Sequence, residues 1–186
     1  MLIDFTLIDN NEIKMLEFSE KFAVADLEVA TKESIEIIHD LIKDLNDEQV
    51  VFIAKDAAAG DEDGWNIAHL VMHATATAEE AAAVSSVLAR GILYPFEPRL
   101  RYETDWQTVT TAEQCLQRVK ESARIRLGYL SAWPDTPQLN IYRGLPEPMI
   151  ERFGQLNATA SYLLGLWHEQ RHFDQLREIV RQATAG

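Results

Sequence analysis

The sequence predicts an all-α fold: a four-helix bundle with a long crossover between helices two and three, plus an N-terminal arm. Four long segments repeat apolar residues every three or four positions, which places those residues on one face of a helix. Between the second and third segments, residues 92–110 contain two prolines and no clean period. Across so long a connection, the third helix need not run antiparallel to the second. Four long helices with one long crossover describe a four-helix bundle.

The length of 186 residues fits one domain, and a hydrophobic fraction of 47% is enough to build its core. We assign residues 26–186 to the bundle. Residues 1–25 have an ambiguous pattern, and we interpret them as an arm or short helix packed on the bundle.

The first helix is predicted from about Asp26 to Leu45, because Ile35, Ile38 and Ile42 continue the helical spacing. The stretch that follows opens with Asn and Gln three residues apart, at positions 46 and 49. That spacing is typical of a capping box, so a short extra helix is expected there.

The second helix is predicted to begin after Asn66, a favoured N-cap residue, and to end near Arg90, where Gly91 can terminate it. Thr110 and Glu113 form a second capping-box pair, which predicts the start of the third helix. The apolar stripe of that helix is Leu116, Val119, Ala123, Leu127 and Leu130.

Prolines at positions 134 and 137 should stop the third helix. A loop with further prolines then leads to the fourth helix, which is predicted to be continuous from about Met149 to Ala183.

The formal net charge of −13 excludes the usual nucleic-acid binder, because such proteins carry a basic face that contacts phosphate. The same acidity argues against binding to an anionic membrane surface. No apolar run reaches the ~18 residues of a membrane span.

Cys115 is the only cysteine, so no internal disulfide can form. Its place in a periodic segment favours a buried structural thiol over a nucleophile. The N-terminus lacks the basic start of a secretory signal, and a cytoplasmic location is expected.

The histidines suggest a metal site. Four of the five fall into two pairs spaced i, i+4 on different helices, His69 with His73 and His168 with His172. Two rings so spaced can lean toward one point, and a third ring from a facing helix leaves one tetrahedral position open, as in a catalytic zinc site. We expect one divalent ion on His73, His168 and His172. Imidazole ligands suit zinc, nickel or iron, so the metal stays open.

The other two histidines are interpreted differently. His39 has no partner at ligand spacing, so we expect an ordinary structural residue. His69 is the third residue of the second helix, where a side chain normally reaches back to the N-cap residue. We therefore expect His69→Glu to keep the metal and to leave the fold at least as stable.

Two other metal chemistries also use histidine and glutamate ligands. His168 to His172 reads HEQRH, the zincin peptidase pattern, in which the Glu acts as general base. No separate glutamate-bearing helix follows to supply a third ligand, so a peptidase is the third choice. A carboxylate-bridged two-metal site needs two Glu-x-x-His motifs. Glu169 with His172 and Glu36 with His39 have this spacing, but the paired histidines favour a site with three His ligands.

Two segments resemble the DinB-like superfamily (the DinB/YfiT type). GWNIAHLVMH, residues 64–73, resembles the family's second helix, in which a Trp and a small polar N-cap precede a His. LLGLWHEQRHFDQLREIV, residues 163–180, is similar to its last helix, in which His-x-x-x-His is followed by Gln, here Gln175. His69 stands where the family usually has an acid, and the N-terminal arm is an addition.

The resemblance implies a four-helix bundle with three His ligands, which correspond to His73, His168 and His172. It implies a divalent metal, often zinc or nickel, a homodimer, and group transfer or isomerisation with a low-molecular-weight thiol. A related domain in sulfoxide-forming enzymes binds iron through a further Glu, and Asp174 stands at that position.

We therefore expect a metal-dependent enzyme, a transferase or hydrolase, that acts on a small-molecule substrate. Tyr142 and Arg143, on the loop before the last helix, are candidates to contact that substrate, although an exposed loop is the plainer interpretation. The alternative is a non-catalytic, stress-associated dimer that binds metal. A coordination position open to solvent would favour the enzyme.

Overall fold

The computed structural model describes residues 2–55 and 64–185, and the regular structure in these ranges is helical throughout. This confirms the all-α prediction. Four short helices, α1 (Thr6–Asp9), α2 (Met15–Ser19), α4 (Asp47–Val50) and α7 (Glu147–Phe153), accompany the 3-10 turn η1 (Trp106–Thr108). The longer helices are α3 (Val24–Ile42), α5 (Ile67–Ala89), α6 (Ala112–Ser131), α8 (Ala158–Arg171) and α9 (Phe173–Thr184).

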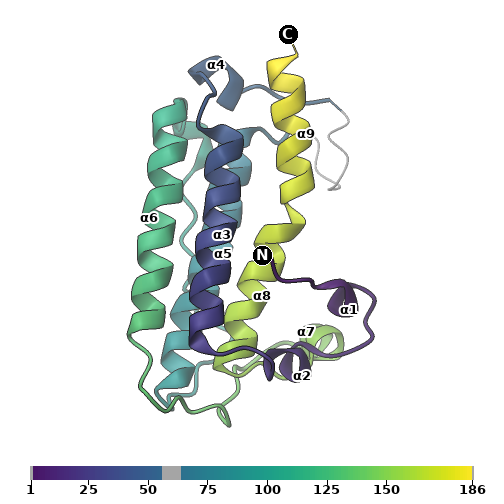
Figure 1. Ribbon diagram of the computed structural model, residues 1–186, viewed down its shortest axis with the longest axis vertical. Helices are drawn as coiled ribbons and strands as arrows, with labels where there is room; N and C mark the ends of the chain where they lie inside the picture. Colours follow the sequence, from purple (N-terminus) through teal and green to yellow (C-terminus); the bar gives the residue numbers. More distant parts are fainter. Residues whose placement is uncertain (1, 56–63, 186) are drawn as a thin grey trace.

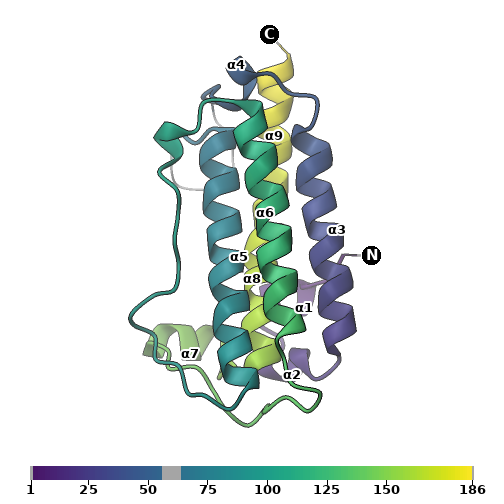
Figure 2. The same cartoon turned by 90° about the vertical axis from the view of Figure 1, so that its left-hand side faces the viewer.

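The long helices lie side by side along the longest axis (Figure 1). Helix α5 packs against α6 and α8, and α3 packs against the same two helices. The segment between α5 and α6 returns along the outside of the bundle, so α5 and α6 run in the same direction (Figure 2). The crossover therefore lies beside α5, between helices two and three of the bundle.

Most predicted helix starts agree with the structure. Asn46 and Gln49 form the reciprocal capping box of α4. The Asn66 side chain caps α5 by accepting a bond from the His69 backbone N–H at 2.8 Å. Past the end of α5, Gly91 has a φ of +82°, a conformation that glycine adopts readily. The first helix begins earlier than predicted, at Val24, because the Asp26 carboxylate accepts from the backbone N–H of residue 23.

The predicted start of the third helix was wrong by one residue. Thr111, not Thr110, is the N-cap of α6, and its capping-box partner is Gln114, not Glu113. The Gln114 side chain accepts backbone N–H bonds from both threonines, at 2.9 and 3.0 Å. The Asp47 carboxylate, on the neighbouring α4, accepts from the backbone N–H of residue 112 and favours this register.

The predicted stripe of α6 was only partly right. Val119 and Leu130 are fully buried, but the other members are half-buried. The buried face instead includes Cys115, Ser122 and Arg126. A charged side chain can occupy this face because it has a carboxylate partner in the core, described below.

The prediction of one continuous last helix was wrong. Helix α7 ends at Gly154, whose φ of +76° and ψ of −168° lie in a region that favours glycine. Asn157 then caps α8 by accepting a bond from the Ala160 backbone N–H at 2.9 Å. A second irregularity lies at His172, between α8 and α9, where its N–H bonds to the carbonyl of Glu169, three residues back.

The N-terminal segment is held against α8. Four of its apolar side chains are buried in the same apolar cluster as residues of α8. Asp9 also accepts hydrogen bonds from Trp167 at 2.9 Å and from Arg171 at 2.8 Å. The buried side chains are Phe5, Ile8, Met15 and Phe18.

The apolar core forms two clusters along the bundle. One contains Leu163 and Leu166 of α8, and the other contains Leu70 of α5 and Phe173 of α9. On α5 and α8, the residues of the two clusters are separated in sequence by residues 73–80 and 168–172. These stretches contain His73, His168 and His172 and several buried polar groups. In the described ranges, no helix is both long enough and apolar enough to cross a bilayer.

Cys115 is expected to be inert in the folded protein. It is fully buried, and burial raises the pKa of its thiol from 9.0 to about 12. A thiol reagent at pH 8 should modify the folded chain very slowly and the denatured chain at once. Between pH 9 and 12 the thiol ionises only in the unfolded chain. This ionisation lowers the free energy of unfolding by about 1.4 kcal/mol per pH unit. Comparison of the free energy of unfolding with that of Cys115→Ala, at pH 8 and at pH 10, isolates this effect. Rapid modification of the folded protein by the thiol reagent would contradict the assignment of Cys115 as a buried, inert thiol.

Candidate metal centre

The structure brings His73, His168 and His172 together. One ring nitrogen from each lies within 4.8 Å of the others. His73 comes from the first half of α5, His168 from the end of α8 and His172 from the junction of α8 and α9. The ring centroids are 4.8 to 5.2 Å apart. The spacing argument therefore identified three side chains that do meet, and their role as ligands stays a prediction.

This donor set fits a divalent metal ion. Metal-binding imidazoles must be neutral. Burial and nearby positive groups lower the pKa of His73 to about 4 and that of His168 to about 3, and burial also lowers the pKa of His172. All three rings are therefore neutral at pH 7. Zn–N bonds of about 2.0–2.1 Å would place tetrahedral ligand atoms about 3.3 Å apart, so the ring nitrogens, which lie within 4.8 Å of one another, would move closer together on binding.

The His172 ring is oriented by Gln175, a buried side chain on α9. Its Nδ1 lies 2.9 Å from the Gln175 Oε1, which can only accept. The proton is thus on Nδ1, and the Nε2 lone pair is left for a metal. The Gln that follows the His pair in the sequence has this orienting role. In contrast, Nδ1 of His168 is buried with no hydrogen-bond partner among the described residues.

Two tryptophans enclose this part of the site. Trp65 stacks on His69 at 4.1 Å between centroids, contacts His73 edge-on at 4.9 Å and stacks on His172 at 5.9 Å. Trp106 stacks on the other face of His69 at 4.7 Å. His69 is thus sandwiched between two indoles and lies outside the three-histidine cluster.

The structural interpretation of His39 agrees with its position. Its side chain is 52% exposed and lies beside Asp40, far from any cluster of ligating groups in the described ranges. Asp174, which resembled the position of an iron ligand, is 90% exposed and pairs with Arg177.

Glu169, the Glu of HEQRH, is turned into the core. It is fully buried and accepts bonds from Arg126, at 2.9 Å, and from the Ser34 hydroxyl. A general base must reach the water that it activates. Glu169 is engaged by Ser34 of α3 and Arg126 of α6, which disfavours the zincin interpretation.

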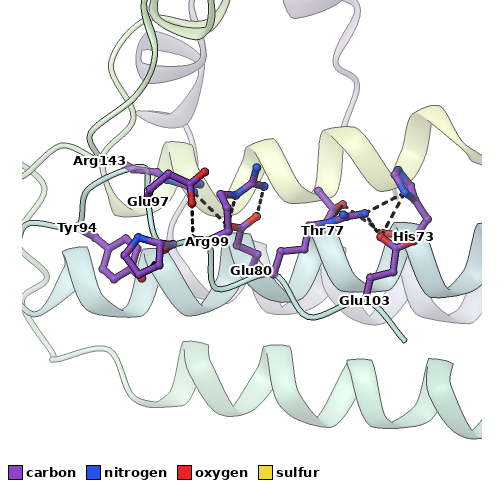
Figure 3. A network of polar contacts seen from close by, with 10 residues as sticks. His73, Thr77, Glu80, Tyr94, Glu97, Arg99, Glu103 and Arg143 are labelled. Carbon is purple, nitrogen blue, oxygen red and sulfur yellow. Dashed lines mark hydrogen bonds and ion pairs between the residues drawn. The ribbon is translucent and has the colours of Figure 1, made fainter. Parts of the chain in front are cut away.

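The crossover adds residues that the sequence patterns did not identify. Its stretch 99–103, here called the strap, runs along α5 with charged side chains directed at it (Figure 3). Arg101 lies 2.9 Å from Nδ1 of His73 and 3.1 Å from the Thr77 hydroxyl. Glu103 pairs with Arg101 and lies 3.7 Å from the same ring nitrogen of His73. The strap therefore contacts a candidate ligand directly.

A signal for the strap is present in the sequence. Charged residues alternate at positions 99, 101 and 103 with Leu100 and Tyr102, which are 42% and 80% exposed. Alternation of this kind is typical of an extended segment with one face against the protein.

A cavity of about 300 Å³ lies next to the histidines, and His73 and His168 form part of its wall. Arg143 also lines it and is buried, whereas the neighbouring Tyr142 is half-buried and outside the lining. Of the two proposed substrate-contacting residues on this loop, only Arg143 is therefore placed at the cavity.

The stacking of His69 changes the outcome expected for His69→Glu. The metal content should stay at one ion per chain, because His69 is outside the cluster. Stability should fall by about 1 kcal/mol, since two ring contacts worth about 0.5–1.5 kcal/mol each outweigh about 0.3–1 kcal/mol gained at the helix N-terminus. Urea denaturation measures this change in stability, with His39→Glu as the control. If His69→Glu lost its metal while its helices stayed intact, His69 would be a ligand.

An all-α chain with three histidines gathered from two adjoining parts of the bundle defines a candidate helical metal-binding protein. The sequence model of the DinB superfamily matches residues 30–176. The chain therefore belongs to the DinB superfamily. No curated protein and no solved structure matches it.

Proposed function

We propose that this protein is a metal-dependent enzyme that acts on a small molecule, with one divalent ion held by His73, His168 and His172. The observation that carries the proposal is the cavity that reaches two of these rings. A ligand set with an open side is typical of catalytic sites, whereas structural sites are closed by four protein ligands. Zinc, nickel and iron all fit the imidazole donors.

When bound, such an ion polarises a substrate oxygen or lowers the pKa of a bound thiol or water. The chain itself orients the rings. Gln175 fixes the His172 tautomer, and Trp65 covers one side of the cluster. Arg101 of the strap donates to Nδ1 of His73, so this contact must be released when His73 binds a metal. The substrate reaches the rings from the cavity.

The metal part is tested with protein purified without a His tag. The metal-free chain is titrated with Zn²⁺, Ni²⁺ and Fe²⁺, and bound metal is measured by elemental analysis. We expect one ion per chain. Less than half an ion per chain for all three metals would contradict the proposal.

Thiol-dependent transfer, suggested by the superfamily resemblance, is the proposed reaction. The test uses 1-chloro-2,4-dinitrobenzene with a panel of low-molecular-weight thiols. A carbon–sulfur bond forms, chloride leaves and the thiol proton goes to solvent. Metal-loaded protein should accelerate this reaction with at least one thiol, and His168→Ala should not. Equal rates for both proteins with every thiol would favour a non-catalytic metal-binding protein.

A cytoplasmic homodimer is the proposed state. Light scattering on the purified chain tests the dimer, and a monomeric mass at micromolar concentration would contradict it.

A further inference from the structure

The cavity beside the histidines has a charged side and an apolar side. Its charged residues lie on α5, on the strap and on the loop before α7. They are Glu80, Arg99, Arg101 and Arg143. The remaining wall is formed mainly by apolar side chains of the crossover, α7 and α8. They are Phe96, Met149, Phe153, Leu164 and Trp167.

The three arginines of this wall are unequally paired with carboxylates. Glu80 is 2% exposed and makes a two-bond pair with Arg99 (Figure 3). Arg143 reaches the same carboxylate through one contact of 3.3 Å. Arg101 is paired with Glu103. Glu97 also lies beside Arg99, so three guanidinium groups face three carboxylates, but Arg143 has only one long contact with a carboxylate.

Arg143 is the least compensated of the three. It is 8% exposed, and its Nε is buried with no hydrogen-bond partner among the described residues. Burial is also the main cause that lowers its pKa. A buried cation is costly unless it is paired and hydrogen-bonded. An anionic group in the cavity beside this guanidinium would offset that cost.

The guanidinium is held in position by its surroundings. Phe96 lies under both Arg143, at 5.6 Å, and Arg99, at 5.0 Å from the ring centroid. A planar guanidinium fixed in this way presents a fork of N–H donors that matches a carboxylate. One weakly paired guanidinium favours a singly charged anion, and the apolar wall favours a hydrophobic body attached to it.

We propose that this cavity binds a small organic carboxylate, with its carboxylate at Arg143, its apolar body against Phe96, Phe153 and Trp167, and its other end toward His73 and His168. This deepens the proposed function, on which it rests, by naming the substrate class of the same cavity. A volume of about 300 Å³ suits a ligand of that size.

The proposal is tested by calorimetric titration of metal-loaded and metal-free protein with phenylacetate and hexanoate. The matched neutral probes are phenylacetamide and hexanamide, and phenyl phosphate is the dianionic probe. The carboxylates should bind at least tenfold more tightly than the amides, in both forms of the protein. Equal binding of acid and amide, or tighter binding of phenyl phosphate, would overturn the assignment.

Arg143→Gln locates the carboxylate, and Arg118→Gln is the matched control. Arg118 also forms a largely buried pair, at 2.8 Å with Glu79, but does not line this cavity. We expect affinity for phenylacetate to fall at least tenfold in Arg143→Gln, to fall less in Arg143→Lys, and to stay within twofold in Arg118→Gln. Unchanged affinity in folded Arg143→Gln would overturn the proposal. If that variant does not fold, the acid–amide comparison on the natural chain decides.

The outcome separates this proposal from the metal proposal. Carboxylate binding that disappears with the metal and is unaffected by Arg143→Gln would show ligation to the ion, and would overturn recognition by arginine. Arginine-dependent binding to a chain that takes up no metal would support the carboxylate site while contradicting the metal centre.

Discussion

His168→Ala is expected to lower zinc affinity by more than about 100-fold, because only two protein ligands would remain. The same loss is expected for His73→Ala and His172→Ala, since each ring supplies one of the three converging nitrogens. Competition with a chromophoric chelator measures the affinity of each variant.

The matched control for these variants is His39→Ala, which removes an exposed imidazole outside the cluster and should bind zinc normally. Circular dichroism of each metal-free variant should retain the helical signal, because the two apolar clusters pack without the ion. Full occupancy in any folded triad variant would remove that residue from the ligand set.

Arg126→Met is expected to destabilise the fold by about 3–5 kcal/mol, because it leaves the Glu169 carboxylate buried without its cation. Arg126 and Glu169 are 1% and 0% exposed and lie 2.9 Å apart. The pair joins α6 to α8, and the Ser34 hydroxyl joins it to α3. Urea denaturation of metal-free protein measures the change without the contribution of metal binding.

The double variant Arg126→Met, Glu169→Leu separates two effects in this result. If most of the loss comes from an uncompensated carboxylate, the double variant should regain at least half of the lost stability. Arg124→Met is the control, because Arg124 forms an exposed pair on the same helix and should change stability by less than about 1 kcal/mol. Equal stability of Arg126→Met and the natural chain would contradict the assigned role of the pair.

The three converging histidines could be predicted because their pairing is local. Residues four apart on one helix share a face whatever the rest of the chain does, so His168 and His172 had to be neighbours. Choosing His73 over His69 depended on the position of Asn66, since an N-cap residue fixes which side chain lies in the first turn.

The helix boundaries that were wrong depended on choices made by tertiary contacts. Thr110 and Thr111 both suit an N-cap, and a backbone bond to Asp47 on another helix favours the second. In the last segment, the apolar period continues through Gly154, so periodicity alone concealed the break. Gly154 followed by Asn157 was nevertheless a readable stop and start signal.

The charged residues of the site could not be identified from periodicity. Arg126 looks like an exposed residue until its partner, 43 residues away, is known. Arg101 and Arg143 come from irregular segments, in which the sequence does not specify which side chains turn inward. Arg101 is bonded to Thr77 of α5, and Arg143 to Glu80 of the same helix.

The alternation along the strap also limits how this protein can vary in evolution. One inserted residue between Arg99 and Arg101 would change the parity of the extended segment and turn the next two charged side chains from α5 toward solvent. Two inserted residues would restore the parity but displace the contacts to Thr77 and His73 by about 6.6 Å. Length changes among natural variants are therefore expected to collect on either side of residues 99–103, while the spacing within that stretch is kept.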